Sequence, residues 1–328
     1  MYVDISSHTF SSLLSLSLPL TLFTNKHTHT HIHTQIRHVS GLSWQGACPW
    51  RPKPNQDRMA AFVDVRTSSL VVAVMDGHGP VGHEASDFLM RHLENVLTSD
   101  PDWNLSPPEK AIERSVLKLD SLLTDRSGID CSLSGSTFVI AVIRHSQVTI
   151  GNVGDSTASS ISLQNDISFV KQISEDHKPE SPEETMRITK AGGLVFAVDP
   201  DGTGPQGPVR VWRKEKDGPG IAMSRSLGDA IATSVGVIAR PDVTTYSLKD
   251  DALGKGRCVG FLLASDALYE FMDGNDVARI LSKRNISTDG AVVQGDKLLR
   301  NMALEIQRRW SDHEDGYVDD TTLVLVLL

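Results

Sequence analysis

The sequence has 328 residues, of which 39% are hydrophobic and 22% are charged, and its formal net charge is -9. These values are typical of a folded globular protein, and they argue against a general nucleic-acid binder, because affinity for a phosphate backbone requires clustered Lys and Arg. The three cysteines lie far apart, without the spacing of a disulfide framework or a zinc site, so we expect a reducing compartment, the cytoplasm or nucleus. No apolar run reaches the roughly 18 to 20 residues that a membrane helix requires.

The first forty residues differ in composition from the rest of the chain. The run LLSLSLPLTLF at 13–23 has the length of a signal-peptide core, but no Lys or Arg precedes it and no clear cleavage site follows. The alternating HTHTHIHT at 27–34 has a metal-binding composition, yet it is also typical of a disordered segment. We therefore expect a disordered or uncertain extension at 1–40 and one domain at 41–328. A secreted or membrane-tethered His-rich metal binder is an alternative that rests on this extension alone.

Apolar and β-branched runs, each bounded by polar residues or Gly, predict strands along the domain. In chain order they are 60–65, 70–75, 137–143, 148–153, 258–264 and 322–327. Apolar residues at helical spacing predict helices over about 85–96, 107–125 and 292–306. We expect loops at 95–108 and 199–220, the second long enough to be a functional flap. Strands cluster and helices come in pairs between them, which indicates a mixed α and β fold.

Carboxylates recur at the ends of the predicted strands. They are Asp57, just before the first strand, then Asp76, Asp155, Asp266 and the pair Asp319-Asp320. Carboxylates at strand ends converge if those ends share one edge of the core, and convergent carboxylates repel each other unless cations hold them. Oxygen donors without Cys or a His pair favour magnesium or manganese over zinc. One Asp after a strand is usually a turn residue, so only the joint pattern indicates a cation site.

A series of motifs occurs in the order typical of one family. They are NQD at 55–57, MDGHGP at 75–80, SGST at 134–137, GNVGDS at 151–156, DHKP at 176–179, RITKAGG at 187–193, PGIAMSRSLGD at 219–229, GVIARPDV at 236–243, LLASDALYEFM at 262–272 and VDDTTLVLVLL at 318–328. With these motifs the chain resembles the metal-dependent serine/threonine protein phosphatases of type 2C, and most of all their plant members. The resemblance implies an α+β fold: a four-layer α-β-β-α sandwich of two antiparallel sheets flanked by helices, with a two-metal site at one end.

The resemblance also implies the residues of the metal site. Asp76 would bridge two magnesium or manganese ions, and the Gly77 carbonyl would bind one of them, since a residue without Cβ lets the backbone approach an ion closely. The remaining roles are Asp266 and Asp319 as ligands of the other ion, Asp57 as the acid that holds metal-bound waters, and Asp155 as a ligand of a weaker third ion.

Two neighbouring cations turn their shared water into a hydroxide near neutral pH, which can attack phosphoserine or phosphothreonine in line without a covalent intermediate. His78 would be the general acid for the leaving oxygen, although a lone His is more often a hydrogen-bonded loop residue. Lys53 would bind the substrate phosphate, with Arg51 or no residue at all as alternatives. We expect phosphorylated proteins as substrates, kinases as further partners, no nucleic acid or membrane, and a monomer.

Three positions depart from the family pattern. Gln56 replaces an acid, and its amide could hydrogen-bond a metal-bound water without charge. Thr157 replaces an Arg, and Ala267 replaces a Gly whose turn an Ala would strain if φ is positive there. These departures motivate the alternative of a catalytically weak relative that binds phosphoproteins or kinases.

Overall fold

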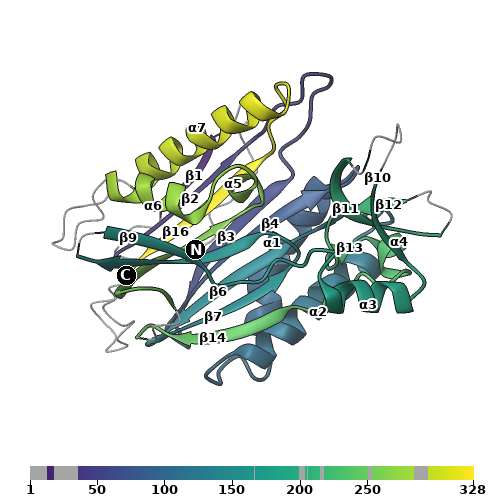
Figure 1. Ribbon diagram of the computed structural model, residues 1–328. Coiled ribbons are helices and arrows are strands. Elements are labelled where there is room, and N and C mark those ends of the chain that lie inside the picture. The colour runs from purple at the N-terminus through teal and green to yellow at the C-terminus, as the bar shows by residue number, and fades with distance from the viewer. Residues whose placement is uncertain are drawn as a thin grey trace.

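Two antiparallel sheets lie face to face in the computed structural model (Figure 1). The structure describes residues 13–17, 36–165, 167–198, 204, 206–214, 218–249, 253–283 and 295–328. The first sheet runs in the order β1 (Leu13–Ser17), β2 (His38–Trp44), β16 (Thr321–Leu327), β15 (Arg257–Ala264), β8 (Thr157–Gln164) and β9 (Ile167–Gln172). The second runs in the order β13 (Leu227–Gly228), β5 (Gly135–Ser136), β4 (Ser69–His78), β6 (Phe138–Arg144), β7 (Gln147–Val153) and β14 (Asp242–Ser247), and β3 (Asp57–Asp64) pairs with β4.

Helices cover the outer face of each sheet (Figure 1). The first sheet is covered by α5 (Ala267–Glu270), α6 (Gly274–Lys283) and α7 (Gly295–His313), and the second by α1 (Gly82–Thr98) and α2 (Glu109–Arg126). The predicted α+β sandwich of two antiparallel sheets flanked by helices is therefore confirmed. Within the described residues, no helix combines the length and the apolar character needed to cross a membrane.

A small third sheet lies beside the sandwich, where the sequence predicted only a loop. It consists of β10 (Leu194–Val198), β11 (Gln206–Trp212) and β12 (Pro219–Ile221), and it neighbours α3 (Pro182–Lys190) and α4 (Ala230–Thr233) (Figure 1). The prediction of a loop throughout 199–220 is wrong for 206–212, because β11 pairs with both neighbours and the Phe196 and Trp212 rings stack across the first pair. Residues 199–203, 205 and 215–217 of the expected flap lie outside the described residues.

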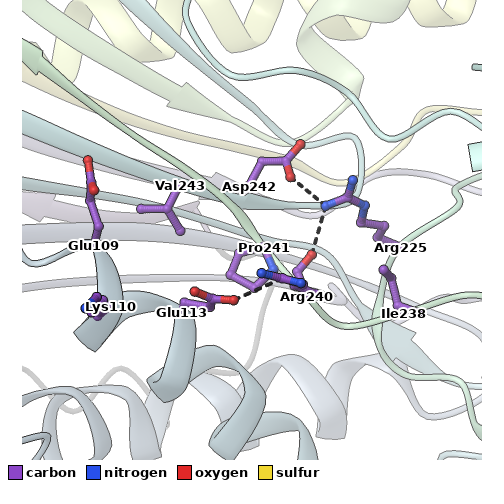
Figure 2. A pocket seen from close by; sticks show the side chains of 9 residues that line it. All are labelled: Glu109, Lys110, Glu113, Arg225, Ile238, Arg240, Pro241, Asp242 and Val243. Atoms are coloured by element: carbon purple, nitrogen blue, oxygen red, sulfur yellow. Dashed lines mark hydrogen bonds and ion pairs between the residues drawn. The ribbon is translucent and has the colours of Figure 1, made fainter. Parts of the chain in front are cut away.

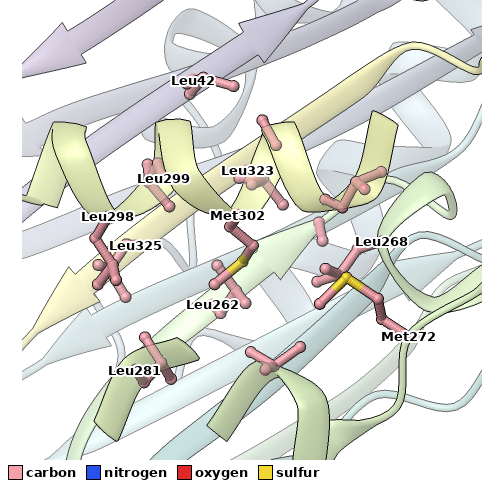
Figure 3. Close-up of a cluster of buried hydrophobic side chains, with 14 of the residues drawn as sticks. Leu42, Leu262, Leu268, Met272, Leu281, Leu298, Leu299, Met302, Leu323 and Leu325 are labelled. Carbon is pink, nitrogen blue, oxygen red and sulfur yellow. The ribbon is translucent and has the colours of Figure 1, made fainter. Parts of the chain in front are cut away.

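The apolar run of β4 is continuous because both of its faces are buried. Leu70, Val72 and Val74 pack into the cluster between the two sheets, whereas the intervening residues pack against α1 and α2. A separate cluster fills the space between the first sheet and its helices (Figure 3). The sandwich therefore has three apolar layers. The polar residues that could form a functional site lie at the ends of the strands.

The first sheet includes residues that precede the expected domain boundary at 41. Strand β2 pairs with β16 from His38 to Trp44, and Val39 is buried between the sheets. Strand β1, inside the expected extension, pairs with the other side of β2. The folded domain thus includes His38, while the segment at 27–34 lies outside the described residues.

We expect deletion of residues 1–35 to leave a cooperatively folding domain, and deletion of 1–44 to abolish folding. The first deletion removes one short edge strand, worth about 2 kcal/mol or less, whereas the second removes β2 and leaves β16 unpaired on one side. Thermal unfolding followed by circular dichroism checks both proteins. A cooperative transition in the shorter protein would contradict the role given to β2.

Candidate functional site

Strands β3 and β4 set two carboxylates side by side. Their antiparallel register places Asp57 opposite Asp76. Asp57 is only 1% exposed, and neither of its carboxylate oxygens has a hydrogen-bond partner among the described residues. Burial, reinforced by the charges of Asp320 and Asp319, raises the pKa of Asp57 to about 7. Burial and the charges of Asp57 and Asp266 raise the pKa of Asp76 well above its usual range.

Two further carboxylates lie at the ends of other strands. Asp266 follows β15 at the start of α5, and burial together with the charge of Asp155 raises its pKa well above the usual range. Asp155 follows β7, and its Oδ2 lies 2.6 Å from Nζ of Lys178. One carboxylate oxygen of each residue, Oδ1, is buried without a partner among the described residues. Strands from both sheets thus bring buried carboxylates close together, and several of their oxygens lack hydrogen-bond partners among the described residues.

Lys53 lies against the pair of acids that precedes β16. Its Nζ is 2.8 Å from Oδ1 of Asp319 and 3.4 Å from Oδ2 of Asp320. Burial alone would lower the pKa of the Lys53 ammonium, but the two carboxylates outweigh it and raise the pKa above its usual value. Asp320 also accepts hydrogen bonds from the backbone N–H groups of Gly46 and Gln56, at 2.6 and 2.9 Å. Asp320 therefore ties β16 to the segments on both sides of Lys53.

The MDGHGP segment is held by close backbone contacts. Thr137 anchors Asp76 from both sides, since its N–H donates to the Asp76 carbonyl at 2.9 Å and its Oγ1 accepts from the Asp76 N–H at 3.0 Å. A Cβ on Gly77 would lie 2.3 Å from the carbonyl oxygen of Gly82, far inside contact distance. Only glycine fits at this position, because a side chain would clash with the backbone of Gly82.

His78 is paired with an acid that the sequence analysis did not single out. Its Nε2 lies 2.6 Å from Oδ2 of Asp229, and its Nδ1 is buried without a partner among the described residues. Burial alone would lower the pKa of His78, but the Asp229 carboxylate raises it above the usual value. Asp229 is itself fixed by a 2.6 Å hydrogen bond from Ser226 Oγ, while Asp120 on α2 accepts from the Gly228 N–H at 2.8 Å. The imidazole is thus oriented by its Nε2 and keeps Nδ1 available.

The three departures from the family pattern make ordinary structural contacts. Gln56 Nε2 donates to the Gly79 carbonyl at 2.8 Å, a bond that a glutamate could not make. Thr157 Oγ1 donates to Asp176 at 3.3 Å. Ala267 begins helix α5 and is buried in the apolar cluster of the first sheet, so the strain considered for a positive φ does not arise.

The structure brings the predicted acids close together: beyond the effect of burial, the charge of Asp319 raises the pKa values of Asp57, Asp76 and Asp266, and the charge of Asp155 raises those of Asp76 and Asp266. Within the described residues, however, no three His, Cys, Asp or Glu side chains already stand as a complete set of metal ligands. Sequence reasoning missed two residues of this centre, Lys178 and Asp229, and it named Asp320 as a strand-end acid without giving it a role. Each lies in a quoted motif, and the signal for Asp229 was the same as for the other acids, a charge after a short strand.

A polar pocket of about 510 Å³ lies apart from these acids, between the start of α2 and the start of β14 (Figure 2). Arg225 lines it and binds Asp242 at 2.7 Å, and Asp242 accepts from His177 Nε2 at 3.1 Å. His177 Nδ1 in turn accepts from the Gly154 N–H at 3.0 Å, next to Asp155. The pocket contains none of the predicted site residues, but its wall supports the turn that carries one of them.

Comparison with known proteins agrees with this arrangement. The family model described as "Protein phosphatase 2C" matches residues 53–309, so Asp319 lies beyond the matched range. The chain is 30% identical over 304 residues to "Probable protein phosphatase 2C 35" of Arabidopsis thaliana, covering 88% of this chain and 82% of the relative. It is 34% identical over 242 residues to "Probable protein phosphatase 2C 61" of the same plant, covering 70% and 69%.

Solved structures support the fold in the same way. The serine-threonine phosphatase 2C from Toxoplasma gondii superposes with a TM-score of 0.72 at 19% identity, covering 97% of this chain and 99% of that one. A C. elegans sex determining protein superposes with a TM-score of 0.68 at 23% identity, covering 90% and 65%. The family model spans most of the sequence, and both plant relatives are at least 30% identical over more than two thirds of their own length, so the chain belongs to the protein phosphatase 2C family.

Proposed function

We propose that the protein is a serine/threonine protein phosphatase that uses two magnesium or manganese ions. The observation that carries this proposal is the group of buried carboxylates at the ends of strands from both sheets, in which oxygens of Asp57, Asp155 and Asp266 lack partners among the described residues. Family membership supplies the reaction class, hydrolysis of a phosphate monoester on a protein.

The proposed ligands are all oxygen atoms, which suit hard divalent cations such as magnesium and manganese. Asp57 presents two unpartnered buried oxygens, and Asp155 and Asp266 present one each. Such orphaned carboxylates are costly in a protein interior unless a cation or a proton compensates their charge. The ions would be held by Asp76, the Gly77 carbonyl, Asp266 and Asp319, with Asp57 beside them and Asp155 near a third position. When bound, two such ions neutralise charge on the phosphoryl group and make water a better nucleophile at neutral pH.

Residues of the chain would donate the proton to the leaving oxygen, bind the substrate phosphate and hold the strand ends in position. Asp229 holds Nε2 of His78, whereas Nδ1 has no partner among the described residues, so Nδ1 is the atom that would donate a proton to the leaving serine or threonine oxygen. Lys53 is the candidate to bind the substrate phosphate, since it is the cation nearest to Asp319. Thr137 and Gln56 hold the two strand ends in place by hydrogen bonds to backbone groups.

Phosphorylated proteins are the proposed substrates, with kinases as further partners. We propose that the protein acts as a monomer in the cytoplasm or nucleus. A catalytically weak, phosphoprotein-binding relative is the competing function. The contacts of Gln56, Thr157 and Ala267 do not favour it, because none of them displaces a proposed ligand.

Phosphate release from a phosphothreonine peptide, with and without manganese, tests the proposed activity directly. We expect manganese-dependent release that Asp76→Asn lowers by about a hundredfold or more, because the carboxylate expected to contact both ions loses its charge. Asp102→Asn is the control, since the Asp102 carboxylate pairs with Arg114 and lies in the loop between α1 and α2. Retention of more than a tenth of the wild-type rate by the Asp76 variant would contradict the assignment. No release despite bound manganese would favour the phosphoprotein-binding relative.

Asp229→Asn should lower kcat by about tenfold or more while leaving manganese affinity and KM within twofold, since it removes the carboxylate that orients His78. The pH dependence of kcat should change as well. Isothermal titration with manganese and steady-state kinetics check the two parts. A loss of manganese affinity as large as the loss of kcat would indicate a structural role for Asp229 instead.

The metal-free protein should lose stability as the pH rises from about 4 to about 7. The pKa of Asp57 is raised to about 7 in the folded state, so the folded protein binds more protons than the unfolded chain within this window. We expect the free energy of unfolding in urea to fall by about 2 kcal/mol or more across the window, and the Asp57→Asn variant to show a smaller fall. Excess manganese should reduce the pH dependence of the wild type, because the ion replaces the proton. Equal slopes for the wild type and the variant would refute this origin.

A further inference from the structure

Lys53 holds the acids before β16 with its ammonium group. Its Nζ lies 2.8 Å from Asp319 Oδ1 and 3.4 Å from Asp320 Oδ2, and its side chain is only 14% exposed. The Tyr317 ring lies beneath it, with 5.2 Å from Nζ to the ring centroid, and the Tyr317 hydroxyl donates to the same Asp319 oxygen at 3.3 Å. Lys53 is thus enclosed by the carboxylates and an aromatic ring.

This pairing contrasts with the state of Asp57 and Asp266. Both oxygens of Asp57 and one oxygen of Asp266 have no partner among the described residues, whereas Asp319 already has a cation of the protein's own. A divalent ion on Asp319 would share a carboxylate with the Lys53 ammonium and would be repelled by it at short range. The divalent ion and the Lys53 ammonium therefore compete for the Asp319 carboxylate.

The acids can release Lys53 without being left unsatisfied. Asp320 keeps the backbone N–H groups of Gly46 and Gln56, and Asp319 keeps the N–H of Asp320 at 2.8 Å. Lys53 itself lies in the segment between β2 and β3, on a long side chain with several rotatable bonds. Departure of Nζ thus requires a rotamer change and no rearrangement of a strand.

We propose that Lys53 is a displaceable counter-ion: a divalent cation binds at Asp319 only when the Lys53 ammonium leaves, and the released ammonium then binds the substrate phosphate. The inference rests on the proposed function, since it concerns the same cation centre. The Lys53 side chain thus first neutralises Asp319, and it binds phosphate after a divalent cation has replaced it there. This competition also means that this chain binds its cation at Asp319 more weakly than its carboxylates alone would allow.

Manganese titration into the full-length protein, followed by isothermal calorimetry, measures the competition without relying on turnover. We expect Lys53→Met, which keeps an unbranched side chain of similar length without the charge, to bind manganese about fivefold or more tightly than the wild type. Lys53→Arg should stay within twofold of the wild type. Lys297→Met is the matched control, because it removes the same charge from the exposed face of α7 and should leave affinity unchanged.

A second titration follows the released ammonium. With manganese saturating, inorganic phosphate should bind Lys53→Met about fivefold or more weakly than the wild type, as expected for the loss of a direct charge contact. Tighter manganese binding together with weaker phosphate binding supports the exchange.

The results that would contradict the inference about Lys53 differ from the result that would contradict the proposed function. Equal manganese affinity in wild type and Lys53→Met overturns the counter-ion inference and leaves the proposed function intact. Unchanged phosphate binding overturns the exchange in the same way. Absence of manganese binding to the wild type and to every variant overturns the cation centre itself, and the inference with it.

Discussion

The antiparallel register of β3 and β4 is the constraint on which the rest of the site depends. Because side chains alternate along a strand, a shift of one residue would turn Asp57 away from Asp76 and bury apolar groups on the wrong face. The register is fixed by the apolar residues of β4, which are buried on both sides. The packing of the sandwich thus holds the carboxylates of Asp57 and Asp76 close together. Their negative charges repel each other unless a proton or a cation neutralises one of them.

The second sheet does not build the centre alone. Asp266 and Asp319 come from β15 and β16 of the first sheet, and Asp320 links that sheet to the loops before β3 through the backbone of Gly46 and Gln56. The charged centre therefore lies where the two sheets meet, and its hydrogen bonds help to hold their ends together. His78 and Asp229 approach from the other side, on the segment supported by α2.

Much of this arrangement was predictable from the sequence, and the reasons are specific. The strands with continuous aliphatic runs, such as β4, β6 and β16, were found because both faces of each are buried. Strand β8 was missed because its sequence, TASSISLQ, is rich in serine although those serines are buried. Strand β2 was missed because it lies partly within the segment expected to be an extension.

The candidate acids were predictable because they lie at the ends of strands, whereas their partners were not. Lys53 was expected to bind phosphate, and its ion pairs with Asp319 and Asp320 depend on a tertiary contact that joins residues far apart in the chain. The same holds for the pairing of His78 with Asp229. Sequence spacing indicates which groups are candidates for a functional site, and the tertiary structure determines which residues each group contacts.

The position of β16 in its sheet has a consequence for how the protein is made. This strand lies between β2 and β15 and follows every other strand in the chain, and it pairs Leu327 with His38. A sheet closed by so distant a contact forms slowly and late. During synthesis, β2 has β1 on one side but lacks its other neighbour, β16, until the ribosome has passed residue 327, so the acids before β16 join the centre last. A nascent chain therefore carries Asp57 and Asp76 long before Asp319 and Asp320 can join them.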